Sequence, residues 1–322
     1  MTNMAMQSAR PVYRTVWPDV GGLSGEPFPK ITVVTPNFNG GAFLERTIRS
    51  VLDQRYPNLE YIVLDGGSTD GSIEVIEKHR SALAHVVIEP DGGQYDAVAK
   101  GFARASGEIF AWLNSDDIFM PWTLRTVAQI FADQPQIQWI MGLPTSMHEG
   151  VIRKVANLRP APRELIGRGL YRHGGLGFIQ QESTFWRGSL YRQCGGLDAT
   201  LKMAGDYDLW RRFARHAELV SVSSILGGFS YHANNRGIRN RDAYLREIEE
   251  IFARQPADLR LPAERILARL ERRRNVLRKW PRLSGLLGCI DALPGYEGPV
   301  LTWDYRDLNY RLTTVKLRTR EL

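Results

Sequence analysis

The chain has 322 residues and a formal net charge of +7, with 43% hydrophobic and 24% charged residues. This composition is typical of a globular protein and excludes a disordered or fibrous one. No apolar run approaches the ~20 residues of a membrane-spanning helix, and residues 1–19 lack the apolar core of a secretory signal. We therefore expect a cytoplasmic protein. The two cysteines, Cys194 and Cys289, form no pair motif, which argues against a disulfide framework or a cysteine-based zinc site.

Short apolar strands alternate with amphipathic helices from residue 30 onward. Strands are expected at residues 31–36, 59–64, 84–89 and 109–113, and helices at residues 44–52, 72–79, 95–105 and 121–133. This alternation predicts an α/β fold with a Rossmann-like, mostly parallel central sheet that is flanked by helices. Between residues 135 and 230 the alternation weakens and glycines and aromatic residues become frequent. Residues 240–293 are expected to be helical, and the last segment irregular.

Polar clusters follow three of the expected strands, at the point where each strand ends. They are Thr35–Asn39, Asp65–Gly71 and Asn114–Asp117. Ligands of open parallel sheets bind beyond the carboxyl ends of the strands. The three loops are therefore expected to meet in one crevice.

Asp116 and Asp117 are adjacent carboxylates just past the apolar strand that ends at Leu113. Holding two carboxylates together is costly unless a cation neutralises them. Oxygen ligands suit Mg²⁺ or Mn²⁺, which bind through one or two carboxylates together with substrate phosphates. The alternative is an ordinary turn, because Asn and Asp are common turn residues.

Asp65 ends the second expected strand and opens a turn with Gly66 and Gly67. A carboxylate at this place is suited to accept a hydrogen bond from the N–H of a uracil or a guanine. Asp70, later in the same loop, has a different interpretation, since it stands where a helix N-cap is expected. The loop does not match the glycine fingerprint of dinucleotide-binding proteins.

Asp206 and Asp208 precede the helix face formed by Leu209, Trp210 and Phe213. Acidic residues are common in the first turn of a helix, and this explanation is sufficient for Asp208. A carboxylate at the mouth of a crevice is also suited to remove the proton of an attacking hydroxyl, and we predict this role of general base for Asp206.

Four segments of the sequence, taken in chain order, match the pattern of a known protein family. They are VVTPNFNGGAFLERTIRSVLDQRYPNLEYIVLDGGSTDGS, EPDGGQYDAVAKGFARASGEIFAWLNSDD, QQESTFWRGSLYRQCGGLDATLKMAGDYDLWRRFA and Tyr231-His232. In this combination the chain resembles family 2 of the inverting glycosyltransferases, in particular the subgroup that builds bacterial surface polysaccharides. The resemblance covers about residues 30–232. It implies the glycosyltransferase-A fold, and the pattern of residues 240–293 adds a helical C-terminal extension.

The resemblance implies a role for each matching position. Asp206 stands at the position of the catalytic base, and Asp116 and Asp117 stand where the family binds its metal. His232 is a further candidate for metal or phosphate contact. The nucleotide-sugar site would be formed by Thr35, Pro36, Asn37, Asn39, Asp65, Gly66, Lys100, Asn114, Ser115 and Asp116. The acceptor side would be formed by Gln180, Gln181, Glu182 and Trp186.

The chain departs from the family pattern at three places. Asn114 replaces the more common Asp, which leaves the metal to Asp116 and Asp117. Gly205 stands where many members have Glu, and no Arg precedes His232. The predicted organisation is an N-terminal tail at residues 1–29, a catalytic domain at residues 30–235 and a helical basic extension at residues 236–322. Within the catalytic domain, residues 30–120 would bind the nucleotide and residues 121–235 the acceptor.

The positive charge of the chain is concentrated near its C-terminal end. Residues 265–282 carry eight basic side chains and one acidic one, a net charge equal to that of the whole chain. Within this segment apolar side chains recur at helical spacing: Ile266, Leu267, Leu270 and Leu277. A basic amphipathic helix favours a membrane surface, here through residues 265–290, with the protein peripheral on the inner face of the membrane. The alternative is a helix that packs its apolar stripe on the catalytic domain.

Together these features predict a metal-dependent, hexosyltransferase-like enzyme with Mg²⁺ or Mn²⁺ as cofactor. The donor would be a nucleotide-diphosphate sugar, a UDP-sugar by preference, and the acceptor a glycan or lipid-linked sugar in cell-surface polysaccharide synthesis. Nucleic acid is not expected as a partner, because no nucleic-acid-binding motif accompanies the basic residues. Two other functions stay open: a catalytically degenerate nucleotide-sugar-binding protein, and a basic membrane-associated scaffold.

Overall fold

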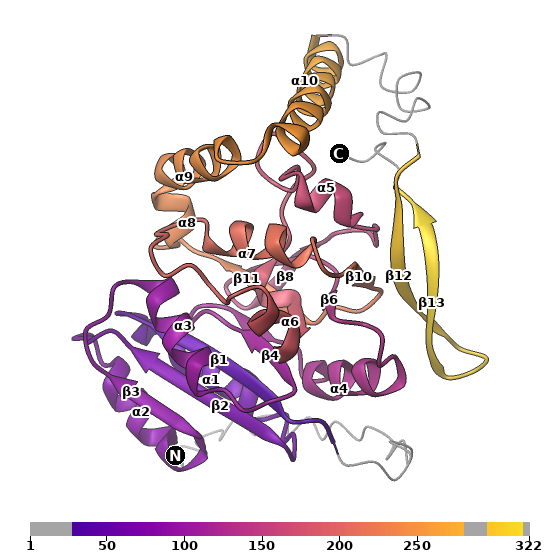
Figure 1. Ribbon diagram of the computed structural model, residues 1–322. Coiled ribbons are helices and arrows are strands. Elements are labelled where there is room, and N and C mark those ends of the chain that lie inside the picture. The colour runs from indigo at the N-terminus through magenta and orange to yellow at the C-terminus, as the bar shows by residue number, and fades with distance from the viewer. Residues whose placement is uncertain (1–27, 280–294, 318–322) are drawn as a thin grey trace, which may run out of the picture.

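A computed structural model describes residues 28–279 and 295–317, and it is built around one large sheet (Figure 1). In spatial order the strands are β13 (Asn309–Lys316), β12 (Glu297–Asp304), β10 (Leu219–Val222), β6 (Trp139–Met141), β9 (Thr184–Arg187), β4 (Ile109–Trp112), β1 (Ile31–Asn37), β2 (Leu59–Asp65) and β3 (His85–Ile88). Strands β4, β1, β2 and β3 are parallel, as are β6, β10 and β12. Strand β9 runs antiparallel between β4 and β6.

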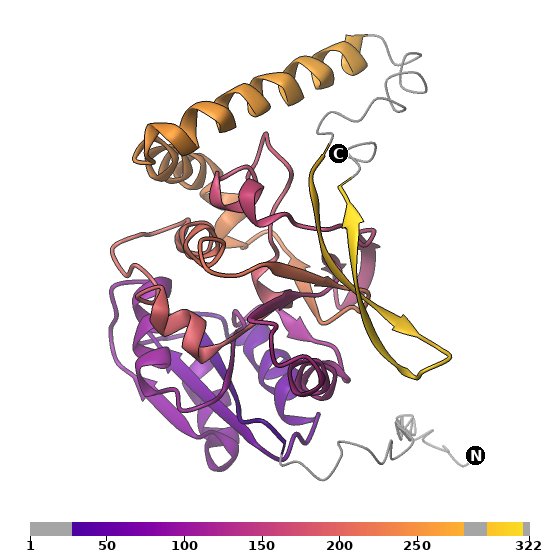
Figure 2. The ribbon, with the colours of Figure 1, turned by 45° about the vertical axis from the view of Figure 1, so that its right-hand side comes forward.

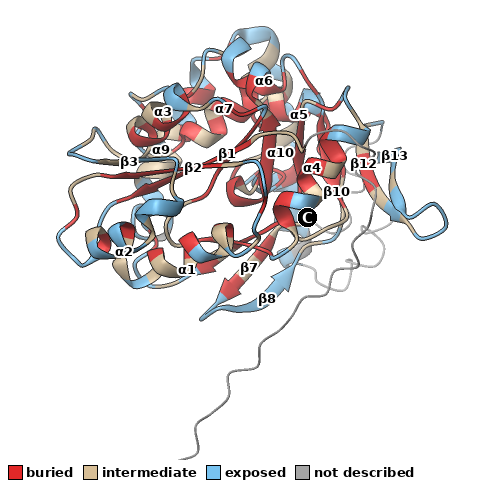
Figure 3. Cartoon of the chain, turned by 90° about the horizontal axis from the view of Figure 1, so that it is seen from below, coloured by how far each residue is buried: buried red, intermediate tan, exposed pale blue. Residues whose placement is uncertain are grey.

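Helices cover both faces of the sheet, which Figure 3 shows as a buried central layer between two partly exposed ones. Helices α1 (Gly41–Leu52), α2 (Ser72–His79) and α4 (Thr123–Asp133) share one hydrophobic core, and α3 (Gln94–Arg104), α6 (Gly188–Gln193) and α7 (Gly205–Phe213) share the other. Successive side chains of a strand point to opposite faces. Val33 of β1 accordingly packs toward α1, whereas Val34 packs toward α3.

The elements expected between residues 30 and 133 are present, with ends shifted by at most a few residues. The predicted parallel sheet is confirmed for β1 to β4. The amphipathic pattern was sufficient there because each helix buries one continuous apolar face, such as Leu44, Ile48 and Val51 of α1.

A second, smaller sheet connects the middle of the chain to the loop that follows β4. Its strands, in order, are β5 (Ile118–Phe119), β11 (Gly227–Tyr231), β7 (Thr145–His148) and β8 (Val151–Val155). Strand β11 pairs with β5 and passes close to the short helix η2 (Gln181–Ser183). A Cβ atom added to Gly227 would lie 2.1 Å from the carbonyl oxygen of Glu182, so only glycine allows this approach.

The C-terminal part is helical only at first. Helices α8 (Arg236–Arg239), α9 (Arg241–Ala253) and α10 (Ala257–Lys279) agree with the expectation for that region, and the rest of the expected helical stretch, residues 280–293, lies outside the described residues. The expectation of an irregular last segment was wrong, because β12 and β13 form an antiparallel hairpin. The hairpin extends the main sheet through parallel pairing of β12 with β10, which buries Val300 and Leu301.

Helix α10 lies on the outside of the molecule, beside α5 (Arg163–Gly167) (Figure 2). Its Ala263 and Leu270 are buried against Leu165 of α5 and Phe252 of α9, and Ile266 and Leu267 pack against the same cluster. This agrees with the alternative in which the helix packs its apolar side chains on the rest of the protein. Within the described ranges, no helix is both long enough and apolar enough to span a bilayer.

We predict that Gly227→Ala destabilises the fold, because the added methyl group meets backbone rather than a mobile side chain. Overpacking of this kind costs about 1–3 kcal/mol, so thermal denaturation should show a melting temperature lower by several degrees. Gly237→Ala is the matched control, since a Cβ atom at Gly237 meets nothing within 4 Å. Equal melting temperatures for the two variants would show that the contact between β11 and η2 is not tight.

Candidate active site

The three polar loops meet, as predicted, in a cavity of about 1270 Å³ at the carboxyl ends of β1, β2 and β4. The end of β1 and the loop after it contribute Pro36 to Gly40, the loop after β2 contributes Gly66, and the loop after β4 contributes Asn114 to Asp116. Further lining comes from η2, the start of α7, and the segment from Phe229 to Leu245. One cavity therefore joins both halves of the predicted catalytic domain.

Asp65 supports this cavity from behind rather than lining it. Its side chain is 1% exposed, and it accepts hydrogen bonds from the Asn37 side chain at 2.7 Å and the Ser68 hydroxyl at 2.8 Å. The backbone N–H groups of Gly67 and Ser68 donate to its other oxygen at 3.0 and 2.7 Å. These four bonds occupy the carboxylate, so the predicted direct contact of Asp65 with a base is corrected to an anchoring of the loops after β1 and β2.

Asp116 and Asp117 point in different directions. Asp116 faces the cavity, whereas the Asp117 carboxylate is buried and accepts hydrogen bonds from the Ser230 N–H at 2.8 Å and the Asn114 amide at 3.4 Å. Burial, together with the charges of Asp116 and Glu182, raises the pKa of Asp117 well above its usual range. The prediction that Asp117 shares a metal with Asp116 is therefore corrected, because the Asp117 carboxylate is buried, bonds Ser230 and is not part of the cavity lining.

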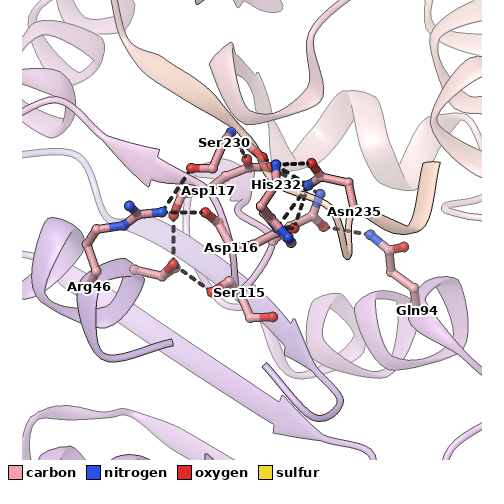
Figure 4. Close-up of polar contacts among 10 residues, drawn as sticks. Arg46, Gln94, Ser115, Asp116, Asp117, Ser230, His232 and Asn235 are labelled. Carbon is pink, nitrogen blue, oxygen red and sulfur yellow. Dashed lines mark hydrogen bonds and ion pairs between the residues drawn. The ribbon is translucent and has the colours of Figure 1, made fainter. Parts of the chain in front are cut away.

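His232 lies directly opposite Asp116 (Figure 4). Its Nε2 atom is 2.9 Å from Oδ2 of Asp116, and the Asn235 amide nitrogen is 3.1 Å from the same oxygen. The imidazole ring stacks on Phe43 of α1 with ring centroids 4.1 Å apart. His232 is thus held in place by an aromatic face and an amide, with one nitrogen directed at Asp116.

Arg46 of α1 fixes the relative position of these groups. Its guanidinium donates to the Asp116 carbonyl oxygen and to the Ser230 hydroxyl, both at 3.0 Å (Figure 4). The neighbouring Thr47 hydroxyl lies 2.8 Å from the carbonyl oxygen of Ser115 and 2.7 Å from that of Asp117. One helix therefore contacts both the loop that carries Asp116 and the strand that precedes His232.

A chain of amides connects Asn114 to a cation at the cavity rim. Oδ1 of Asn114 accepts from the Trp112 indole at 2.8 Å and from the Gln94 amide at 2.6 Å. The Gln94 oxygen in turn accepts from Arg236 at 3.0 Å. Arg236 is exposed and lines the cavity, so its positive charge is available to an anionic ligand beside Asn114.

Asp206 lies at the start of α7, on the wall opposite the strand ends. Its carboxylate accepts from the Tyr207 N–H at 2.8 Å, and the Tyr95 hydroxyl is 3.4 Å away. Removal from bulk water raises the pKa of Asp206 to about 6. A carboxylate with this pKa is ionised at neutral pH and is more basic than an ordinary Asp, which is suitable for proton removal.

Glu182 is buried in η2 and lines the cavity together with Gln180 and Gln181. Burial comes first among the causes that raise its pKa to about 8, and the charges of Asp116 and Asp206 add to the effect. Its Oε1 atom has no hydrogen-bond partner among the described residues. Gln180 binds the backbone of Thr145 at 2.6 Å, and Gln181 donates to the Trp112 carbonyl oxygen, so these two side chains brace the wall.

Three other predicted site residues lie outside the cavity lining. Thr35 is buried and its hydroxyl bonds the Tyr61 hydroxyl at 3.0 Å. Lys100 forms an ion pair with Asp96 one turn earlier on α3 at 2.9 Å. Trp186 is fully buried in the core. Burial therefore argues against direct ligand contact by Thr35 and Trp186, and contact by Lys100 stays a prediction, whereas Pro36, Asn37, Asn39, Gly66, Asn114 and Ser115 do line the cavity.

The sequence also left several lining residues without a role: Asp91, Gln94, Tyr95, Arg236 and Arg241. A signal existed for Asp91, because Asp91-Gly92-Gly93 repeats the acid-plus-glycine turn of Asp65-Gly66-Gly67 after the next strand. No local pattern marks Arg236 and Arg241, which reach the cavity from the C-terminal helices.

Asp116 and His232 fit a divalent cation. Their facing atoms are 2.9 Å apart, close to the ~3 Å between neighbouring ligands of an octahedral ion with bond lengths of ~2.1 Å. A carboxylate and an imidazole suit Mn²⁺ better than Mg²⁺, because imidazole is the ligand of softer ions. Within residues 28–279 and 295–317, no group of three or more His, Cys, Asp or Glu side chains is arranged to hold a metal. The protein contribution would therefore be these two side chains, with substrate phosphates beside them.

The sequence matches the model of glycosyl transferase family 2 over residues 32–188. An uncharacterized glycosyltransferase of Mycobacterium tuberculosis is 29% identical over 203 residues, which are 62% of this chain and 75% of that protein. The Bacillus subtilis protein TuaG, whose name assigns it to teichuronic acid biosynthesis, is 38% identical over 92 residues, 28% of this chain and 36% of its own.

Solved structures share the fold at low sequence identity. Residues 1–349 of Staphylococcus aureus TarS, in complex with UDP-GlcNAc, align with a TM-score of 0.58 and 18% identity over 80% of both chains. The longer TarS chain is covered to 39%. The Pyrobaculum calidifontis mannosyltransferase PcManGT, in complex with GDP-Man and Mn²⁺, aligns with a TM-score of 0.54 and 19% identity over 75% of this chain and 70% of its own. The chain has a glycosyltransferase-A-like fold, and over residues 32–188 its sequence is similar to glycosyl transferase family 2.

Proposed function

We propose that the protein transfers a hexose, with inversion, from a UDP-sugar to a hydroxyl of a glycan or lipid-linked acceptor in cell-surface polysaccharide synthesis. The observation that carries this proposal is the arrangement of one cavity. Asp116 and His232 lie where the donor diphosphate would be bound, and Asp206 lies on the opposite wall. Sugar transfer needs both groups, because charge develops on the leaving diphosphate while the acceptor hydroxyl loses a proton.

The nucleotide would occupy the end of the cavity formed by Asn39, Gly66 and Asp91. Asp91 takes the place that the sequence suggested for Asp65, as the carboxylate that accepts from the N–H of uracil. The TarS structures with UDP and UDP-GlcNAc support a UDP-sugar, whereas PcManGT was solved with GDP-Man. The name of TuaG supports a role in polysaccharide synthesis.

In this proposal the acceptor oxygen attacks the anomeric carbon on the face opposite the diphosphate. Its proton passes to the Asp206 carboxylate, and the electron pair of the broken C–O bond stays on the diphosphate. Arg236, held beside Asn114 by Gln94, stabilises part of that negative charge. Burial raises the pKa of Glu182 to about 8, so at neutral pH its carboxyl is mainly protonated and is available to donate a hydrogen bond to a ligand in the cavity.

Asp116 and His232 would hold Mn²⁺ or Mg²⁺. The ion supplies charge neutralisation for the diphosphate when it is bound. Asn235 and Phe43 keep the His232 ring in the orientation that this requires. A degenerate nucleotide-binding protein is less well supported, because Asp206 and Asp116 both face the cavity and a non-catalytic protein has no need of a carboxylate with a pKa of about 6.

We expect Asp206→Asn to lower turnover by roughly 10²–10⁴-fold, the usual contribution of a general base. The variant should bind UDP as the wild type does, because Asp206 is not on the donor side. Turnover is measured as release of UDP from UDP-glucose and UDP-GlcNAc with water as acceptor. In the wild type kcat/KM should fall as the pH drops through about 6, since protonated Asp206 cannot accept a proton.

The matched control for that experiment is Asp208→Asn. Asp208 is two residues away on the same helix and pairs with Arg212 at 2.8 Å, outside the cavity lining. Wild-type turnover by the Asp206 variant, or equal losses in both variants, would remove Asp206 from the reaction.

We expect Asp116→Ala and His232→Ala to abolish the gain in UDP affinity that Mn²⁺ gives to the wild type. The reason is that Nε2 of His232 and Oδ2 of Asp116 face each other at 2.9 Å in the cavity, where they would share the ion. Calorimetric titration of UDP with and without Mn²⁺ measures the gain directly. His216→Ala is the control, because His216 lies near Gln193 and outside the cavity lining. A Mn²⁺-dependent gain retained in both variants would place the metal elsewhere.

We also propose that α10 contacts an anionic membrane surface. The face opposite Ala263 and Leu270 carries exposed basic side chains: Arg265, Arg269, Arg272 and Lys279. Leu261 and Val276, which are 48% and 40% exposed, lie on the same face. The packed stripe therefore leaves a second, basic face free, and a lipid-linked acceptor would bring the enzyme to such a surface.

Replacing Arg265, Arg269 and Arg272 together with Gln should weaken binding to vesicles that contain phosphatidylglycerol by roughly 100-fold, from the usual contribution of a basic residue near an anionic surface. Co-sedimentation with these vesicles and with neutral phosphatidylcholine vesicles measures the effect. The control replaces Arg55, Arg104 and Arg153, which are exposed on other elements. Equal weakening in the two triple variants would mean that net charge, and not α10, determines binding.

A further inference from the structure

The cavity continues beyond Asp206, on the side away from the strand ends. Its outer wall consists of His173, Phe178, Arg241 and Tyr244. Tyr244 lines the same cavity as Asp206, and the charge of Asp206 adds to the burial that raises the pKa of the Tyr244 phenol. Small-molecule pockets usually have volumes of ~300–1,000 Å³, and this cavity, at about 1270 Å³, has space for a second ligand beside the donor.

Arg241 is the main charge of this outer wall. It is exposed at the start of α9, and within the described part of the chain it forms no ion pair with a carboxylate. Its polar contact is with His173, whose Nε2 atom lies 2.9 Å from the guanidinium. An arginine whose neighbour is an imidazole retains its full positive charge for a ligand.

The nearest acidic groups do not neutralise Arg241. The carboxylate of Glu247 accepts hydrogen bonds at 2.6–2.8 Å from the backbone N–H groups of Lys202, Met203 and Ala204. Asp242 follows Arg241 on the helix and therefore points about 100° away from it. Asp206 belongs to the proposed reaction centre.

Two aromatic side chains complete the wall. The rings of Phe178 and Tyr244 are 6.1 Å apart, and Phe178 is 48% exposed although it lies at the edge of a cavity. Exposed aromatic rings at the edge of a cavity are suited to pack against the apolar face of a sugar ring. A cation beside an aromatic surface is suited to a sugar that carries a negative charge.

We propose that His173, Phe178, Arg241 and Tyr244 form the acceptor subsite and that the acceptor sugar carries an anionic group, a phosphate or a carboxylate. This inference rests on the proposed transferase function and adds the chemical class of the acceptor. The donor diphosphate is a less suitable partner for Arg241. Arg236, which bonds Gln94 and through it Asn114, already provides a cation on the donor side.

The test is calorimetric titration of the full chain saturated with UDP and Mn²⁺, so that the donor side is occupied. The probes are glucose, glucose 1-phosphate, glucuronic acid and inorganic phosphate. Glucose 1-phosphate, glucuronic acid or both should bind at least about tenfold more tightly than glucose, and the comparison between the two identifies the anion. Inorganic phosphate should bind more weakly than the preferred sugar, because it makes no contact with Phe178.

Arg241→Gln should abolish the preference for the anionic sugars, and Arg241→Lys should retain part of it. Arg246→Gln, an exposed arginine on the same helix outside the cavity lining, should change nothing. Equal affinity for glucose and both anionic sugars, or a preference that survives in Arg241→Gln, would overturn the inference. Absence of UDP binding would instead contradict the proposed function. The same sugar titrations without nucleotide would then show whether the site at Arg241 prefers anionic sugars.

Discussion

The buried carboxylate of Asp117 is the group on which the site depends most. It accepts the Ser230 N–H at 2.8 Å and so ties the loop after β4 to β11, two segments that are 113 residues apart. Because of this bond, Asp116 faces the cavity and His232, two residues beyond Ser230, meets it at 2.9 Å. Arg46 also donates hydrogen bonds to both segments. A pair of acidic residues that resembled two metal ligands is thus one ligand candidate and one structural anchor.

The carboxylates after β2 and β3 are likewise divided into one that holds the loops and one that faces the cavity. Asp65 accepts hydrogen bonds from Asn37, Gly67 and Ser68, and Gly66 is the residue of that turn that lines the cavity. Asp91 of the next loop also lines the cavity. Buried carboxylates with several donors hold the strand-end loops in shape, and the half-buried ones remain free for ligands. The pKa values of Asp206 and Glu182, about 6 and about 8, follow from their position in the wall between the proposed donor and acceptor sides.

The alternation of strands and helices predicted the sheet because each element buries a regular apolar face, and the strand ends predicted the cavity. Side-chain direction was not predictable. Neither the family motif nor the spacing indicates which of Asp116 and Asp117 turns inward. The hairpin β12–β13 was missed because its stability comes from pairing with β10, almost eighty residues earlier. Arg236 and Arg241 belong to the site only through tertiary packing, so no local pattern could identify them.

The measurement that tests the central claim most directly is proton NMR of the sugar first released from an α-linked donor, UDP-glucose or UDP-GlcNAc, with Mg²⁺ as the diamagnetic ion. A base on the wall opposite the diphosphate delivers the acceptor oxygen to the far face of the anomeric carbon. The account therefore predicts that the β-anomer appears first and the α-anomer only later by mutarotation. Initial release of the α-anomer would contradict the opposed arrangement of Asp206 and the Asp116–His232 pair.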